Sequence, residues 1–119
     1  MQKKISAGIV YYKNKKAGLL IKTKEGYEFS YNLSYLNDDM AKPISLSMPM
    51  TKERYKSQTL FPFFDGILPE GWLLGQISSA LKIDSNDKFN LLMHVGRDTV
   101  GAVSIVPLTG FPNKKKQIK

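Results

Sequence analysis

The chain has 119 residues, of which 42% are hydrophobic, 24% are charged and none is cysteine. This length allows one domain with a single core but not two. The lack of cysteine excludes disulfides, thiolate catalysis and cysteine-based zinc sites, and it favours a reducing compartment. The apolar run at residues 5–12 is too short and too interrupted for a signal peptide, and no uncharged stretch approaches the roughly 20 residues of a membrane span. We therefore expect a soluble, cytoplasmic protein.

Positive charge is concentrated at the two ends of the chain. The formal net charge is +8; residues 1–24 contain seven lysines and no acidic residue, and the last six residues add four lysines. Residues 25–113 carry seven basic and ten acidic side chains. Cationic segments can displace counterions from nucleic-acid phosphates, but basic surfaces more often give solubility and non-specific association. We favour the second interpretation and keep nucleic-acid binding as an alternative.

The first third of the chain predicts an antiparallel meander. Strands are expected at residues 5–12, 17–23 and 27–31, because each segment combines β-branched or aromatic residues with alternating polarity, and polar turns separate them. Such alternation is typical of a sheet with one buried face. A short helical turn is expected within residues 33–40.

The middle of the chain predicts a further strand and then a helix. Residues 43–50 alternate between apolar and polar side chains and are bounded by prolines, a pattern that favours an edge strand. Residues 51–57 are expected to form a charged loop. A helix follows from about Gln58, with Pro62 tolerated only in its first turn.

The last third predicts two helices and a final strand. Proline favours the first position of a helix, so one helix is expected at residues 69–82. Acidic and amide residues that can cap a helix precede the next one, at residues 87–94, and Gly96 is expected to end it as the C′ residue. Residues 99–107 predict the last strand.

These elements together predict an α+β fold. We expect a small twisted antiparallel sheet, barrel-like in form, with about three helices inserted before the last strand. The predicted domain covers residues 1–108, and residues 109–119 are expected to form a basic, disordered tail. Phe61, Phe63 and Phe64 are assigned to the core because clustered aromatic residues usually pack together.

The sequence lacks recognisable catalytic and metal-binding patterns. It has one histidine, His94, and its acidic residues do not have EF-hand spacing. The segment GRDTVG at residues 96–101 lies between a predicted helix and a predicted strand, which is the wrong order for a dinucleotide-binding loop. We interpret it as structural: Arg97 and Asp98 tie the loop by hydrogen bonds, and Gly101 lets backbones approach. We therefore expect no enzyme activity, no cofactor, no metal and no small-molecule substrate.

Three motifs, in this order and spacing, resemble the N-terminal subdomain of HipA-type serine/threonine kinase toxins. They are PISLSMP at 43–49, FFDGILPE at 63–70 and GRDTVGAV at 96–103. The resemblance covers roughly residues 5–108. It implies structural rather than catalytic roles for the residues of the second and third motifs, namely Asp65, Pro69, Gly96, Arg97, Asp98 and Gly101. In these toxins the subdomain continues into a kinase body, whereas this chain ends in a lysine-rich tail. It is thus similar to HipS, the stand-alone component of three-gene systems that also encode a shortened kinase, HipT, and a DNA-binding protein, HipB.

The resemblance implies an antitoxin that binds and neutralises a HipT-like kinase toxin. A HipB-like protein, and DNA at most indirectly, would be reached through the ternary complex, and no membrane partner is implied. Two alternatives remain open: a stand-alone basic nucleic-acid-binding domain, and a non-catalytic domain excised from a longer HipA kinase. The polar tail favours the free-standing form.

The predicted helix at residues 69–82 offers a contact for such a kinase. At 100° per residue its apolar residues fall within one arc, typical of a core stripe: Leu73, Leu74, Ile77, Ala80 and Leu81. Trp72 falls on the opposite side of the helix. Because tryptophan is enriched among interface anchors, Trp72 either contacts a partner or is covered by residues 66–69.

The predicted partner-binding set surrounds this tryptophan and consists of Glu70, Gly71, Trp72, Gly75 and Gln76. The two glycines are small enough to permit close approach of another chain. Asp65 and Glu70 are interpreted as capping or rim residues rather than as catalytic carboxylates.

Overall fold

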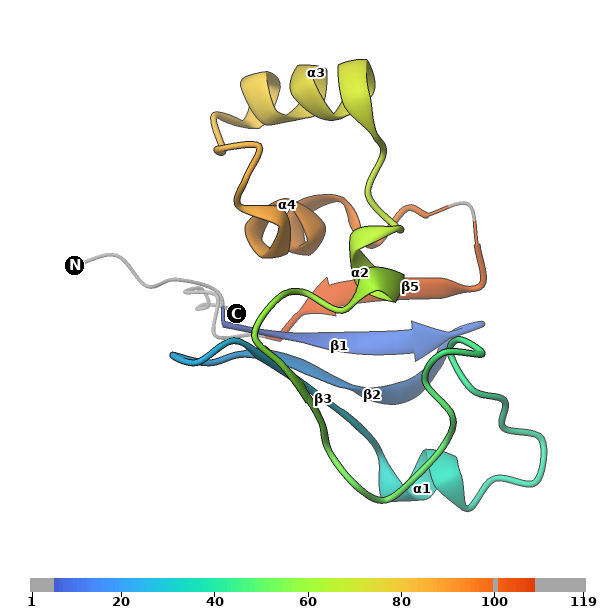
Figure 1. Cartoon of the computed structure of the whole chain (residues 1–119). Helices are drawn as coiled ribbons and strands as arrows, with labels where there is room; N and C mark the ends of the chain where they lie inside the picture. Colours follow the sequence, from blue (N-terminus) through green and yellow to red (C-terminus); the bar gives the residue numbers. More distant parts are fainter. Residues whose placement is uncertain (1–5, 100, 109–119) are drawn as a thin grey trace, which may run out of the picture.

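A computed structural model describes residues 6–99 and 101–108 (Figure 1). The strands are β1 (Ala7–Tyr12), β2 (Lys15–Lys22), β3 (Tyr27–Tyr31), β4 (Tyr55–Ser57) and β5 (Val103–Pro107), and the helices are α1 (Leu33–Leu36), α2 (Pro62–Asp65), α3 (Gly71–Leu81) and α4 (Lys88–Val95). The strands form one antiparallel sheet in the order β4-β3-β2-β1-β5. The α+β prediction is confirmed, and three helices, α2, α3 and α4, lie between β4 and the last strand; the sheet is open rather than closed into a barrel, with β4 and β5 at its edges.

The meander forms where the alternation of polarity predicts it. The turn between β1 and β2 has two residues, Lys13 and Asn14, with φ of 47° and 72°. Positive φ at both positions is the geometry whose twist suits a two-residue hairpin, and it lets β2 begin at Lys15 rather than at Ala17. Within β2, a Cβ on Gly18 would lie 2.3 Å from the carbonyl oxygen of Ser30, so the close pairing of β2 with β3 requires glycine there.

The strand predicted at residues 43–50 is wrong. Ile44 and Met48 are buried, but the chain between them reverses, with a single bridge joining Ser45 to Met48. The Ser45 hydroxyl accepts the N–H of Ser47 at 3.1 Å, which is how serine competes with a strand ladder. The fourth strand is instead β4, inside the segment 51–57 that predicted a loop.

The first two of the inserted helices start later than predicted. The short helix α2 begins at Pro62, with Phe61 as its N-cap, so the proline does occupy the first turn. The helix α3 begins at Gly71, two residues after Pro69, because Gly71 has a φ of 57° that breaks the helical path before it.

The helix α4 confirms its predicted cap but not its predicted ending. The Asp87 side chain accepts the backbone N–H of Asn90 at 3.3 Å. Gly96 follows with a φ of −69°, so it is not a left-handed C′ residue. It is required for space: a Cβ would lie 2.6 Å from the carbonyl oxygen of Leu92. Beyond it, β5 begins at Val103 rather than at residue 99.

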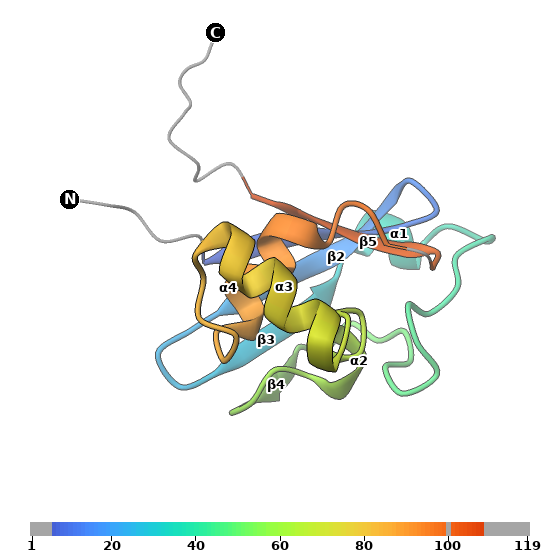
Figure 2. The same ribbon diagram turned by 90° about the horizontal axis from the view of Figure 1, so that it is seen from above.

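The core lies between the sheet and the layer formed by α2 and α4 (Figures 1 and 2). Phe29 from β3, Phe64 from α2 and Phe89 from α4 are fully buried, and the rings of Phe29 and Phe64 lie 5.6 Å apart. Phe61 is also buried and Phe63 packs against the core, which confirms the assignment of this aromatic cluster. The predicted tail at 109–119 lies outside the described residues.

The longest helix that the structure describes has 11 residues, and none of these helices has the length and apolar character to cross a membrane.

Candidate protein-binding surface

The helix α3 lies on α4, on the side away from the sheet (Figures 1 and 2). None of its 11 residues is buried. Only Leu74 and Ile77 pack against the core, and they are half-buried. The helix is therefore an outer element whose surface is mostly open.

The core stripe predicted for this helix is only partly correct. Leu74 and Ile77 face inward, but Leu73 is 47% exposed, Leu81 is 40% exposed and Ala80 is also exposed. The physical reason is that α4 already closes the core over the sheet with four buried side chains. Nothing remains for most of the α3 stripe to cover.

Trp72 is 76% exposed. Residues 66–69 therefore do not cover Trp72, so the second of the two interpretations of this residue is excluded. The carboxylate of Glu70 makes no capping hydrogen bond to α3, although this residue is the N-cap. Gln76, one turn beyond the tryptophan, is exposed as well.

The two glycines of the predicted set leave the surface beside Trp72 open. A Cβ built on Gly71 or Gly75 meets no other group within 4 Å. Gly75 is thus not needed for packing inside the domain, whereas Gly71 is needed for its positive φ. The five predicted partner-binding residues lie at the N-cap and in the first two turns of α3, and all are exposed.

The helix α3 contains no charged residue, since its sequence is GWLLGQISSAL. A helix that faces water on most sides ordinarily carries charged side chains on its outer face. Here Trp72 and Leu73 are exposed at the start of the helix and Leu81 at its end, and exposed apolar side chains on an uncharged helix favour an interaction surface. Sequence reasoning missed the two leucines by assigning them to the core; the lack of charge over residues 71–81 is the signal that could have identified them.

The residues of the second motif support the layer of helices. An oxygen of Asp65, at the end of α2, lies 2.9 Å from the amino group of Lys88 at the start of α4. Both groups are well exposed, so this ion pair adds little to stability. Pro69 is half-buried in the link between α2 and α3.

The loop between α4 and β5 is held differently from the prediction. Arg97 and Asp98 are exposed. The Asp98 backbone N–H donates to the carbonyl oxygen of Val95 at 3.3 Å, the Ile105 N–H donates to the carbonyl oxygen of Gly96 at 2.9 Å, and the Thr99 hydroxyl donates to the carbonyl oxygen of Val103 at 2.5 Å. A Cβ on Gly101 would meet nothing within 4 Å among the described residues, so the expected close approach is wrong.

Sites for chemistry are not evident in the part of the chain that the structure describes. No group of three histidine, cysteine or acidic residues there could hold a metal ion. His94, in the last turn of α4, is exposed and hydrogen bonds through Nδ1 to the carbonyl oxygen of Asn90 at 2.9 Å. An open depression beside β3 and β4 is lined by polar groups such as Glu25 and Lys56, unlike the enclosed, apolar sites that small molecules prefer.

Comparison with known proteins identifies the fold. Residues 8–106 match the family model described as the HipA N-terminal domain. A solved structure, the N-terminal domain of HipA toxin, superposes with a TM-score of 0.66 and 32% sequence identity, covering 91% of this chain and 97% of that one.

The relatives place this domain in two settings. A Haemophilus influenzae protein of uncharacterized function is 36% identical over 105 residues, which are 88% of this chain and 95% of that protein. Two Sinorhizobium fredii proteins named as kinases are also similar: Y4mE is 33% identical over 79 residues, and Y4dM is 33% identical over 88 residues. Those stretches cover 66% and 69% of this chain, yet they are only 19% and 22% of the two kinases.

Proposed function

This chain belongs to the HipA N-terminal domain family, and from that premise we propose that it is an antitoxin. It binds and neutralises a cytoplasmic, HipA-type serine/threonine kinase toxin, of the shortened HipT-like kind. It does so without enzyme activity, cofactor or metal, and it reaches a HipB-like DNA-binding protein only through the kinase.

The observation that carries this proposal is the surface of α3. The helix has eleven uncharged residues, none of which is buried, and Trp72, Leu73 and Leu81 are exposed. A large aromatic side chain beside small residues fits the anchor-and-pocket arrangement of binding hot spots. Inhibition then needs only binding energy, spent on covering the catalytic site or on holding an inactive geometry.

The two settings of the domain support a kinase as the partner. In Y4mE and Y4dM the matched part belongs to the same chain as the remaining four fifths of the protein. In the Haemophilus influenzae relative it makes up nearly the whole protein. A surface that packs within one chain can also bind between chains, provided that contacts replace the effective concentration given by the covalent link.

Co-expression with the kinase encoded beside this chain tests the proposal. We expect the two proteins to co-purify and the growth arrest caused by the kinase to be relieved. Trp72→Ala should weaken the complex at least tenfold, the loss typical of an anchor residue, and should leave the fold intact because the side chain is exposed. If the unchanged protein neither co-purifies with the kinase nor relieves the arrest, the antitoxin function is wrong.

The net charge of +8 supports one alternative, a basic nucleic-acid-binding domain. The isolated protein would then bind duplex DNA with an affinity that falls steeply as salt rises. Such binding, found together with no kinase binding, would favour the alternative.

A further inference from the structure

A second uncharged surface is formed by residues 43–51, here called the 43–51 loop, and the loop is attached to the sheet by a buried tyrosine. The hydroxyl of Tyr31, on β3, accepts the N–H of Ile44 at 3.1 Å and donates to the carbonyl oxygen of Met48. The side chains of Ile44 and Met48 are themselves buried. Both ends of the turn are thus fixed by one side chain and by packing.

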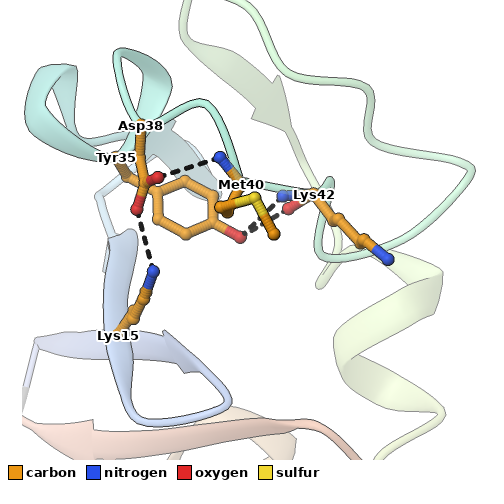
Figure 3. Close-up of polar contacts among 5 residues, drawn as sticks. All are labelled: Lys15, Tyr35, Asp38, Met40 and Lys42. Atoms are coloured by element: carbon orange, nitrogen blue, oxygen red, sulfur yellow. Dashed lines mark hydrogen bonds and ion pairs between the residues drawn. The ribbon is translucent and has the colours of Figure 1, made fainter.

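Two further tyrosines hold the segments on either side of the turn. The Tyr35 hydroxyl donates to the carbonyl oxygen of Lys42 at 2.5 Å and accepts its N–H at 3.2 Å (Figure 3). The Tyr55 hydroxyl donates to the carbonyl oxygen of Pro49 at 2.5 Å. The same close-up shows Asp38 bound to Lys15, which ties this region to β2. The loop is irregular but has many fixed points.

The tip of the loop presents one leucine. The backbone carbonyl oxygen of Ser45 accepts the N–H of Met48 at 3.0 Å, and the side-chain hydroxyl of Ser45 accepts the N–H of Ser47. Between them Leu46 is 95% exposed. A leucine held out on a fixed turn loses little conformational freedom when it enters a pocket, which favours binding.

We propose that the 43–51 loop is a second contact for the same kinase, with Leu46 entering an apolar pocket of the kinase body. This inference rests on the proposed function. The loop, PISLSMPMT, contains no charged residue although 24% of the chain is charged. It lies apart from α3, at the level of the sheet (Figure 1), so contacts at both surfaces would fix the orientation of a large partner.

The kinase fits this surface better than a second copy of the chain does. The turn presents Leu46 outward, whereas the open depression beside β3 and β4 is lined by charged side chains such as Glu25, Glu28 and Lys56, which do not suit a leucine. Two copies would also bring together net charges of +8 each. About four fifths of each related kinase lies outside the matched part, which is large enough to contact both surfaces of this domain. A domain that binds the kinase as a separate chain gains from an extra contact, because no covalent link raises its effective concentration.

The affinity of the full chain for the co-encoded kinase tests the inference. Leu46→Asp should weaken binding at least tenfold and leave the thermal unfolding midpoint unchanged, since the side chain lies in solvent. The matched control is Leu108→Asp, at a leucine that is 40% exposed outside both surfaces and should bind as the unchanged chain does. Combined with Trp72→Ala, the losses should multiply, because the two sites are distant.

The outcomes separate this inference from the proposed function. Unaltered kinase binding by Leu46→Asp overturns the second contact and leaves the antitoxin function standing. A loss of self-association by this variant, with kinase binding unaltered, also overturns it and assigns the loop to a second copy. If the unchanged chain does not bind the kinase, the proposed function fails and the second contact fails with it.

Discussion

The helix α3 and the 43–51 loop are alike in composition and opposite in how they are held. Each is uncharged and presents exposed apolar side chains. The helix satisfies its backbone internally and has no buried residue, whereas the loop has two buried anchors and takes backbone hydrogen bonds from tyrosine hydroxyls. Regular secondary structure is therefore a poor measure of how firmly a segment is fixed. Backbone groups that a helix pairs by itself must be paired by the rest of the fold in a loop.

The largest expected effect comes from comparing a substitution in the loop with one in the helix, each at an isoleucine. Ile44→Ala, in the loop, should cost about 2–5 kcal/mol of unfolding free energy, because a buried side chain is removed. Ile77→Ala, in α3, should cost about 1 kcal/mol, because that side chain is only half-buried. Urea denaturation of both variants measures the two costs. Equal losses would contradict the conclusion that the loop is the better anchored of the two segments.

The next largest effect isolates the hydroxyl of Tyr31. Tyr31→Phe leaves the N–H of Ile44 and the carbonyl oxygen of Met48 without their partner, so we expect a loss of about 1–3 kcal/mol. Urea denaturation again measures the loss. Tyr11→Phe is the control, since Tyr11 is half-buried in β1 and has no hydroxyl hydrogen bond among the described residues. A similar loss in both variants would mean that the loop does not depend on this clamp.

The same variant makes a prediction about alkaline pH. Burial raises the pKa of Tyr31 from 10.0 to about 12, so the hydroxyl keeps its proton in the folded state after the unfolded chain has lost it. Stability should therefore fall as the pH rises from 10 to about 12. Tyr31→Phe should show a shallower fall over this window than the unchanged chain, because the contribution of the Tyr31 hydroxyl is removed. Parallel curves would show that Tyr31 does not carry the effect.

These long-range contacts explain why some parts of the fold could be predicted from the sequence and others could not. The strands of the meander and the Asp87 cap are set by residues close together in sequence, and both predictions are confirmed. The strand expected at residues 43–50 is wrong because its backbone partners are hydroxyls from β3 and β4. Alternating polarity reports which side chains are apolar, not which backbone groups will pair.

In the candidate site, too, the feature set by local sequence was predicted and the feature set by long-range packing was not. The helical angle of Trp72 placed it opposite the apolar stripe, and the residue is exposed. Burial of Leu73 and Leu81 could not be judged in the same way, because it depends on whether α4 has already closed the core. Periodicity locates a face of a helix, but only tertiary packing decides what lies against that face.

Two glycines in α3 give an effect of intermediate size that sharpens the comparison. Gly75→Ala should stabilise the helix by about 1 kcal/mol, because the site is open and alanine has the higher helix propensity. Gly71→Ala should destabilise it by about 1–2 kcal/mol, because Gly71 has a φ of 57°. Hydrogen exchange of the α3 amides measures both changes, with the amides of β2 as the internal control. Opposite signs are required; a shared sign would mean that packing, rather than backbone conformation, sets the stability of α3.

The smallest expected effect lies where the chain leaves α1 toward the loop. The Met40 N–H first, and then Lys15 at 3.0 Å, hold the pKa of Asp38 below its ordinary value (Figure 3). A lowered pKa in the folded state means that the contribution of Asp38 to stability is present above its unfolded pKa and is lost as the pH falls through the folded value. Lys15→Met should raise the pKa of Asp38 and slightly lower the unfolding temperature at pH 7.

The pH dependence distinguishes this ion pair from a packing effect of the lysine side chain. Once Asp38 is protonated, the difference between the unchanged chain and Lys15→Met should disappear, which thermal unfolding at pH 2 measures. Lys16→Met, an exposed lysine in the same strand, is the matched control and should show no such difference at either pH. A difference that persists at pH 2 would assign the effect to the methylene groups of Lys15. The ion pair between Lys15 and Asp38 is exposed, whereas the Tyr31 hydroxyl is buried. Lys15→Met should therefore lower the stability less than Tyr31→Phe does. The loop then depends on its buried tyrosine more than on surface charge.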